Sequence, residues 1–364
     1  MSDLASRLPG RPPIDLAPTG GGSGVVSRPE APLTQHWWPV ATLAELAAGQ
    51  PLARTLHGQP LVVFRAADGG PAVLPDRCPH RHAPLSAGRV RDGELACPYH
   101  GWRFDGAGRC TRVPGLDDAG GRACLLPPLA SRIAHGLVWA CAAPNPATPE
   151  PVAPAVSEGV DAFFMVDTVR CTAAEAAENL LDGTHTHFVH AGWIRRDDKR
   201  QTVRAQVRRL PDGIEARYSE EGLQSGLISS LLEGSRTESF GRFRMPGVAE
   251  IEYRGRRGLN LLATAWLTPE DTDRLRVHVR VATRRGLAPA WLKRIFLGRL
   301  FGIILGQDKA ILERTRANMA RFAAAGPAPD LLDSPLDLLG PSIRRLLAGE
   351  ALDPAVEREL VCRI

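Results

Sequence analysis

Two short pairs of metal-binding residue types lie close together in the first half of the chain. The first pair is Cys78 and His80, and after 16 intervening residues the second pair is Cys97 and His100. Each pair fits on one tight loop, so two loops that close on each other can hold a metal centre. Zinc sites usually group Cys with Cys and His with His, whereas here each loop contributes one of each. That mixture favours a [2Fe-2S] cluster in which two Cys hold one iron and two His hold the other.

A further histidine in the first loop, His82, competes with His80 as a ligand. The Cys-x-His spacing of Cys78 and His80 matches the Rieske type of [2Fe-2S] cluster. We therefore predict that His80 is the ligand and that His82 faces solvent or supports the ligands indirectly. Pro79 and Pro98 follow the two cysteines and add the rigid turns that ligand loops need.

A second group of residues that can do chemistry lies between positions 179 and 190. It contains the three histidines His185, His187 and His190, preceded by Asn179 and Asp182. On an ideal helix His185 and His190 point about 140° apart, so they can share a metal only if the helix unwinds or bulges between them. His187 and His190 have the easier i,i+3 spacing. The spacing alone leaves both pairs open.

A mononuclear iron site of the two-His-one-carboxylate type also needs an acidic residue from elsewhere. Residues 289–325 are expected to form a long helix, in which Asp308 falls on one stripe with Leu300, Ile304 and Leu312. A lone carboxylate on an inward face is costly unless it is paired or bound to metal. We therefore predict Asp308 as the third ligand, with a buried salt bridge to an arginine as the alternative.

The composition is that of an ordinary globular protein with two domains. Its 364 residues are 44% hydrophobic and 23% charged, enough for two hydrophobic cores. The net charge is +5, but the 45 basic and 40 acidic residues are interspersed and aromatic residues make up only 5%. Stacking platforms for bases are therefore scarce, and we expect no nucleic-acid partner.

Neither a membrane segment nor a disulfide framework is indicated. No apolar run reaches the roughly 18 residues of a membrane span, and Asp3 and Asp15 interrupt the N-terminus, so we expect no membrane partner and no signal peptide. The chain has seven cysteines, two of which are assigned to the cluster. We expect the others to be reduced, which suits a cytoplasmic protein.

Three regions follow from the pattern of turns and apolar runs. Residues 1–32 are rich in Pro and Gly and predict a flexible arm. Residues 33–150 contain short apolar runs separated by turns, which predicts a small all-β domain with the cluster loops at its tips. A Pro-rich segment at 144–155 reads as a linker. Residues 151–364 then form the second domain.

The second domain is expected to be an antiparallel sheet with helices on one face, of α+β class. A helical segment is predicted from Thr172 to His190. Alternation with a period of two predicts strands, and these fall at 203–209, 214–218, 249–254, 260–267 and 275–281. The residues after 326 read as a looser tail with one or two short helices.

The chain resembles the α subunit of Rieske non-haem iron oxygenases over most of residues 36–325. The cluster motif, with its PYHGW segment at 98–102, is similar to the family's C-x-H and C-x-x-H loops. The series Asn179, Asp182, His185, His190 resembles the family's mononuclear iron motif, which favours His185 over His187. QDKAILE at 307–313 is similar to the segment that carries the third ligand. A small residue is more usual at the position of His82, and the N-terminal arm is longer than expected.

The resemblance implies a helix-grip catalytic domain beside the Rieske domain, O2 as cosubstrate, and electrons from NAD(P)H through a separate flavin reductase or ferredoxin. It is closest to the branch of vanillate and dicamba O-demethylases and phthalate-type enzymes, which implies a homotrimer. Asp182 would then bridge the ligand His185 to a cluster histidine, His80 or His100, of a neighbouring subunit. We expect monooxygenation of a small organic substrate, by hydroxylation or oxidative demethylation. The alternatives are cis-dihydroxylation of an aromatic ring and a Rieske electron carrier whose second domain binds a ligand.

Three features stay open at the level of sequence. On the strand at 260–267, either Leu262, Thr264 and Trp266 or their neighbours Leu261, Ala263 and Ala265 line the substrate pocket. His278 alternates with arginines, which favours a solvated face over the pocket. The basic segment 195–209 is either a solvated surface or a docking site for an acidic ferredoxin.

Overall fold

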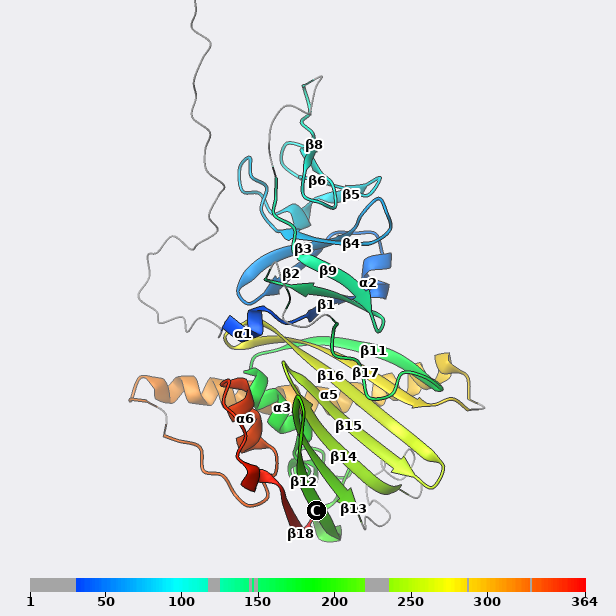
Figure 1. The fold of residues 1–364 in the computed structure, drawn as a ribbon, viewed down its shortest axis with the longest axis vertical. Coiled ribbons are helices and arrows are strands. Elements are labelled where there is room, and N and C mark those ends of the chain that lie inside the picture. The colour runs from blue at the N-terminus through cyan, green and yellow to red at the C-terminus, as the bar shows by residue number, and fades with distance from the viewer. Residues whose placement is uncertain are drawn as a thin grey trace, which may run out of the picture.

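The computed structural model describes residues 31–116, 125–143, 146, 150–219, 236–286, 288–327 and 329–364. The predicted flexible arm, up to residue 30, lies outside these residues, as does part of the Pro-rich segment. A smaller β part, which contains the cluster motif, sits on one face of a large sheet, and the long helices lie on the other face (Figure 1).

The smaller part consists of three short antiparallel sheets, which confirms the predicted all-β region. The first sheet has the order β1 (Trp38–Thr42), β10 (Leu137–Cys141), β9 (Ala130–Ala134), and the second β2 (Leu52–Leu56), β3 (Gln59–Arg65), β4 (Pro71–Pro75). The third runs β5 (Arg89–Arg91), β6 (Glu94–Ala96), β7 (Arg103–Phe104), β8 (Cys110–Arg112). Short helical turns are α1 (Ala31–Thr34), α2 (Leu43–Ala47) and η1 (Leu85–Ala87).

Strand β3 connects two hydrophobic cores because its successive side chains point to opposite faces. Leu61 and Val63 enter the core beside β1 and β10, whereas Val62 and Phe64 enter a second core that contains Cys78 and Cys97. All four β3 residues are at most 1% exposed. The cluster loops are therefore anchored by their cysteines in a packed core.

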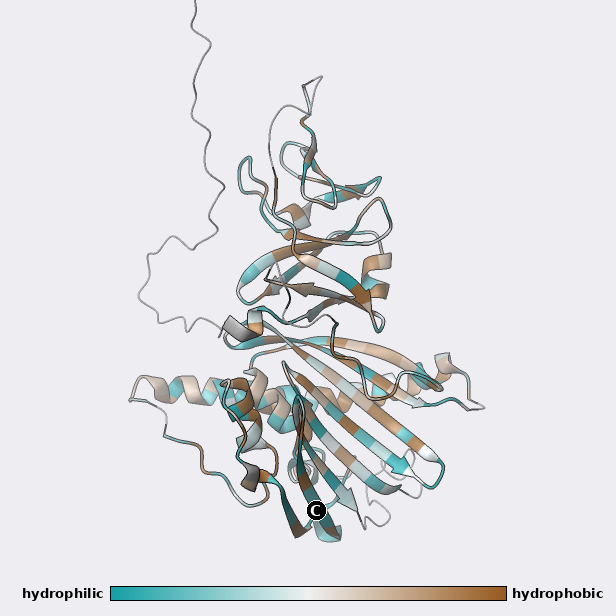
Figure 2. Ribbon diagram, in the orientation of Figure 1, coloured by the Kyte–Doolittle hydropathy of each residue, from teal (hydrophilic) through white to brown (hydrophobic). Residues whose placement is uncertain are grey.

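The larger part is built on one eight-stranded antiparallel sheet. Its order is β11 (Val160–Val169), β17 (Arg274–Arg284), β16 (Gly258–Asp271), β15 (Val248–Gly255), β14 (Arg236–Arg244), β13 (Gly213–Ser219), β12 (Thr202–Leu210), β18 (Arg358–Arg363). Hydrophobic and hydrophilic residues alternate along its strands (Figure 2), as in β12, where buried and exposed positions take turns. All five predicted strands are present, and the sheet gains β11, β14 and β18.

Three helices cover one face of this sheet: α3 (Ala173–Leu181), α5 (Ala290–Ala323) and α6 (Gly340–Leu347). Helix α5 agrees closely with the predicted long helix. The one or two short helices predicted after residue 326 are present as α6 and η4 (Pro354–Val356). The tail is not loose, however, because α6 packs against the core and β18 pairs with β12 at the edge of the sheet. The α+β class is confirmed.

The opposite face of the sheet is covered by the smaller part. Trp139 of β10 meets Trp266 of β16 edge to face, with ring centroids 5.9 Å apart, and the Thr268 hydroxyl donates to the Pro39 carbonyl at 2.8 Å. His278 lies on this covered face and is 0% exposed. The expectation that His278 faces solvent is therefore wrong, because a second domain lies over the polar stripe of β17.

Candidate metal centres

The two cluster loops have the same backbone design. In the first loop the Cys78 amide donates to Ala83 and the Cys78 carbonyl accepts from His82; in the second, Cys97 does the same with Trp102 and Gly101. The residues at the equivalent positions, His82 and Gly101, both have positive φ, 61° and 72°. Glycine adopts this conformation without strain, whereas histidine does so at a cost. This is the physical reason that a small residue is more usual at position 82.

Within this frame the loops bring the two cysteines together and the two histidines together. The rings of His80 and His100 have centroids 4.6 Å apart, and Trp102 stacks on His80 at 4.8 Å with an interplanar angle of 7°. The Nδ1 atom of His80 is buried without a hydrogen-bond partner. His82 is exposed. A Cys pair, a His pair and a buried nitrogen left over fit a dinuclear cluster with the ligands Cys78, His80, Cys97 and His100.

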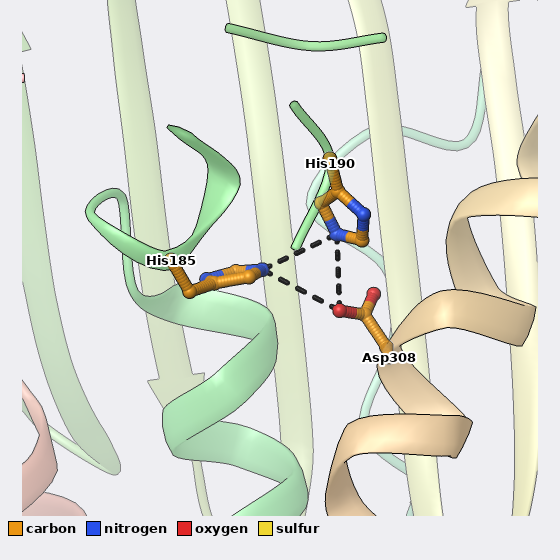
Figure 3. Close-up of side chains that lie close together, drawn as sticks. All are labelled: His185, His190 and Asp308. Atoms are coloured by element: carbon orange, nitrogen blue, oxygen red, sulfur yellow. Dashed lines mark hydrogen bonds and ion pairs between the residues drawn. The ribbon is translucent and has the colours of Figure 1, made fainter. Parts of the chain in front are cut away.

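The second candidate centre is a triangle formed by His185, His190 and Asp308 (Figure 3). The two Nε2 atoms are 3.3 Å apart, and they lie 3.4 Å and 3.0 Å from Oδ1 of Asp308. A metal about 2.1 Å from three ligands on one octahedral face separates those ligands by about 3.0 Å. Oδ1 of Asp308 has no hydrogen-bond partner in suitable geometry although it is buried. The donor set and its spacing therefore fit an iron of the two-His-one-carboxylate type.

The two histidines can meet because helix α3 stops before either of them. The predicted helix to His190 is too long: α3 ends at Leu181, and Asp182 has an extended backbone with ψ 124°. Carboxylate oxygens of Asp182 accept from the amides of Thr184 and His185 at 2.6 and 2.9 Å, which closes a tight turn in place of the next helical turn. The segment continues as the 3-10 helix η2 (His185–His187).

The site has a pronounced electrostatic character. Burial lowers the pKa of His185, but the carboxylates of Asp182 and Asp308 outweigh it and raise that pKa to about 9. Burial also opposes ionisation of Asp182, yet contacts with His185 and Thr184 lower its pKa to about 2. The pKa of Asp308 is lowered in the same way by the two histidines, against the effect of burial. The negative charge of the Asp182 and Asp308 carboxylates beside the two histidines favours a cation at the centre of the triangle.

Other residues of the predicted group take different positions. His187 is 2% exposed and its Nδ1 lies 3.3 Å from the Thr184 carbonyl, so its ring belongs to the turn and not to the triangle. Asn179 lines a second small cavity together with Asp308, and its Oδ1 is buried without a partner. Sequence reasoning missed Gln307, whose Oε1 lies 2.8 Å from Nδ1 of His190. The position of Gln307 next to Asp308 on the same helix could have indicated that it lies near the metal ligands.

A cavity of about 140 Å³ opens beside the triangle. Its walls are mostly apolar, and Leu261, Ala263 and Ala265 of β16 form part of them together with Phe301 and Ile304 of α5. Of the two alternate sets on β16, this is the one on the cavity side. Trp266 of the other set packs against the smaller domain.

The basic segment is not a uniform surface. Arg195 is only 7% exposed and donates to the Gly183 carbonyl at 2.9 Å, so it belongs to the wall of the site. Arg196 pairs with Asp198, and Arg200 pairs with Asp197. The hypothesis of a docking surface that includes Arg195 is therefore wrong, because that side chain is inside the protein.

Comparison with known families identifies both halves of the chain. Residues 36–129 match the Rieske [2Fe-2S] domain, and residues 169–351 match the vanillate O-demethylase oxygenase C-terminal domain. The chain belongs to the Rieske oxygenase family. Its cofactors are therefore a [2Fe-2S] cluster and a mononuclear iron.

The chain is similar to several curated members of the family. It is 35% identical over 211 residues to the oxygenase component of dicamba O-demethylase from Stenotrophomonas maltophilia, covering 55% of this chain and 60% of that protein. It is 34% identical to chlorophyllide a oxygenase from Chlamydomonas reinhardtii, over 46% of this chain and 26% of that protein. The match to the phthalate 4,5-dioxygenase oxygenase subunit of Pseudomonas putida is 33%, over 44% and 39%. Against the first curated relatives, the chain spans only 26% to 47% of their length.

The fold is also that of a solved oxygenase. The crystal structure of dicamba monooxygenase bound to 3,6-dichlorosalicylic acid superimposes with a TM-score of 0.74 at 24% identity, covering 87% of this chain and 97% of the other. This similarity concerns the fold alone. Among the helices that the structure describes, none is long and apolar enough to cross a membrane.

Proposed function

We propose that this protein is a Rieske monooxygenase that hydroxylates or oxidatively demethylates a small organic substrate. It would use O2 and electrons from NAD(P)H, delivered by a separate reductase or ferredoxin. The observation that carries the proposal is the triangle of His185, His190 and Asp308, whose ligand atoms lie within 4.8 Å of one another at the wall of an apolar cavity. A protein that only carried electrons would need neither the triangle nor the cavity.

The chain's own residues would act by holding, orienting and excluding water. Cys78, His80, Cys97 and His100 would hold the cluster. When bound, the cluster supplies single electrons and the mononuclear iron activates O2. His185, His190 and Asp308 would hold that iron at the wall of the cavity. The apolar walls favour an apolar substrate body and keep water away from the reacting atoms.

Electron transfer would occur between subunits of a homotrimer. Within one chain the large sheet separates the two centres, because the Rieske part covers one face and the triangle lies among the helices of the other (Figure 1). A neighbouring subunit's cluster could approach the triangle from the helix side. We propose that Asp182 links His185 to the cluster histidine of that neighbour. The turn hydrogen bonds of Asp182 would then have the additional effect of fixing its carboxylate beside His185.

Monooxygenation is favoured over ring dihydroxylation by the branch of the family. The C-terminal half matches the domain of a demethylase, and the relatives include a dicamba O-demethylase and a 4beta-methylsterol monooxygenase. The phthalate 4,5-dioxygenase subunit is also a relative, so cis-dihydroxylation is the second candidate. We also propose that the protein is cytoplasmic, as expected from its sequence.

Iron analysis combined with product analysis tests the proposal. The protein should contain three irons per chain, and Asp308→Ala should contain two and form no product while its cluster remains reducible. Lys309→Ala is the matched control, since Lys309 is the next residue of α5 and pairs with Asp167 at the surface. Two irons per chain in the unchanged protein, or full product formation by Asp308→Ala, would refute the assignment. Incorporation of one or of two atoms of labelled O2 into product distinguishes the two reaction types.

A further inference from the structure

The N-terminal half of helix α5 has two opposite apolar faces. One face is buried: Leu297 is 4% exposed and Ile304 7% exposed, and Ile304 lines the cavity beside the triangle. The other face is not covered by any described part of the chain. It carries large hydrophobic side chains with the following exposed fractions: Trp291 63%, Leu292 45%, Ile295 52%, Phe296 52% and Ile303 42%.

The exposed apolar residues form a ridge on one face of the helix, in which four cluster at 291–296 and the exposed Arg299 separates them from Ile303. At 100° per residue, positions 291, 292, 295, 296 and 303 fall within an arc of about 140°. Trp291 and Ile295 are one turn apart, as are Leu292 and Phe296. Four large exposed apolar side chains within six residues, unlike scattered apolar residues, indicate a surface that contacts something other than water.

The surroundings of the ridge are strongly basic. From Arg284 to Gln307, with both ends included, the sequence has five basic residues and no acidic residue, and Arg294 and Arg299 are exposed. Where β17 ends and β16 begins, Arg284 donates to the Arg257 carbonyl at 2.9 Å. A groove joins these strand ends to the ridge, because residues from both line it: Arg257, Arg284, Leu292 and Phe296 among them.

Little negative charge compensates these cations. Asp161 pairs with Lys293 at 2.7 Å and lies 3.7 Å from Arg285. Within the described residues, the exposed Arg256, Arg257, Arg294 and Arg299 form no ion pair.

We propose that this ridge, with its basic border, docks the protein on the surface of an anionic lipid bilayer. A helix with Trp, Phe and Ile on its outer face and Arg beside them lies in the interface plane and does not span the membrane. Lys and Arg side chains near an anionic leaflet favour binding to it. A symmetric contact between the ridges of two copies would bring like charges together and is disfavoured. The sequence-based expectation of no membrane partner rested on the lack of a spanning run, and an interfacial surface has no such run.

The position of the ridge connects the membrane to the active-site cavity. Leu300, Phe301 and Leu305 of the same helix line that cavity, so α5 would separate the bilayer surface from the substrate site by the thickness of one helix. An apolar substrate that partitions into lipid would then have only a short path to the site.

Vesicle sedimentation with the complete protein tests the proposal. We expect strong binding to phosphatidylcholine vesicles that contain roughly one-third phosphatidylglycerol, and weak binding to phosphatidylcholine alone. Binding should fall steeply in about 0.5 M salt. The double variants Trp291→Ser/Phe296→Ser and Arg294→Glu/Arg299→Glu should each lose about tenfold or more of the affinity for anionic vesicles.

The matched controls come from the C-terminal half of the same helix. Met319→Ser/Phe322→Ser and Arg314→Glu/Arg321→Glu change exposed residues of the same types and should bind like the unchanged protein. Equal losses in the test and control variants, or no binding to anionic vesicles at all, would overturn the proposal. A change of oligomeric state in the Trp291 variant with unchanged vesicle binding would also overturn it, in favour of contact with a second copy.

A second measurement avoids any destabilising substitution. Brominated lipids quench the fluorescence of tryptophans that enter the acyl region, and Trp291→Phe keeps the face apolar. The unchanged protein should be quenched by brominated anionic vesicles, and most of that quenching should disappear in Trp291→Phe. Identical quenching of both proteins would show that Trp291 stays out of the bilayer and would refute the docking geometry.

Discussion

Gln307 offers the sharpest test of how the mononuclear site is built. Its Oε1 lies 2.8 Å from Nδ1 of His190, a side chain that is only 1% exposed. Because Nε2 of His190 points to the centre of the triangle, Nδ1 must carry the proton, and the amide oxygen of Gln307 is its acceptor. The amide therefore fixes both the tautomer and the orientation of the ring.

Replacing Gln307 by Leu should weaken iron binding without disturbing the cluster. The change leaves a buried N–H without an acceptor, which costs about 1–3 kcal/mol, and outer partners of metal-bound histidines typically contribute about 10- to 100-fold in metal affinity. We therefore expect the affinity for Fe(II), measured by competition with a chromophoric chelator under anaerobic conditions, to fall about 10- to 100-fold. The visible absorbance of the cluster should stay unchanged.

Two further variants make the result specific. Gln307→Glu retains an oxygen acceptor and should bind iron at least as tightly as the unchanged protein. Lys309→Leu removes a surface ion pair with Asp167 from the same helix and should leave iron affinity unchanged. If Gln307→Leu bound Fe(II) as tightly as Lys309→Leu, the hydrogen bond would have no role in positioning His190, and the reasoning would be wrong.

Three other predictions concern the remaining parts of the molecule. Burial lowers the pKa of His278 to about 3 from 6.5, so the native state holds the neutral ring and stability is lost as pH falls below 6.5. From pH 8 to pH 5 the unchanged protein should lose about 2 kcal/mol of unfolding free energy that His278→Leu does not lose, measured by urea titration, and parallel curves would contradict this. Cys97→Ser should abolish the cluster's absorbance and leave the mononuclear iron bound, because serine lacks a thiolate; a surviving Rieske EPR signal would disprove the ligand assignment. Asp182→Asn should keep both metal centres and the oligomeric state but slow reoxidation of the reduced cluster by substrate and O2, followed by rapid-freeze EPR, and a normal rate would exclude the bridging role.

The cluster site could be predicted from sequence because its determinants are local. Both ligands of a loop lie within four residues, and the loop closes through backbone hydrogen bonds of the same few residues. The backbone strain at His82 could not be predicted from the sequence. The expectation of a small residue at this position was consistent with it. Its left-handed φ of 61° explains that expectation.

The mononuclear site was predictable only in part, because its members come from distant segments. Residue spacing left open whether His185 or His187 pairs with His190, with the easier spacing for His187, and the choice depends on where helix α3 ends. The Asp182-Gly183-Thr184 sequence held the relevant signal, since an Asp that caps a turn competes with helix continuation. Gln307 lies 117 residues beyond His190, and only the packing of α5 against the turn brings the two together.

The largest error was the prediction that the His278 face of β17 is exposed to solvent. It shows a limit of predictions from strand periodicity. Alternation correctly predicts which residues share a face, and His278 does share one with Arg276 and Arg280. It does not predict whether that face meets water, because a second domain can cover it. Here the Rieske part lies on the polar face, so Glu250, Thr264 and His278 are all 0% exposed. Glu250 is accommodated by hydrogen bonds from Thr264 and the Ala155 amide, whereas both ring nitrogens of His278 have no partner within the described chain. The contact between the domains therefore accommodates the neutral imidazole of His278 but not its charged form. For this reason the unfolding free energy should fall in acid, where the His278 ring would be protonated in the unfolded state.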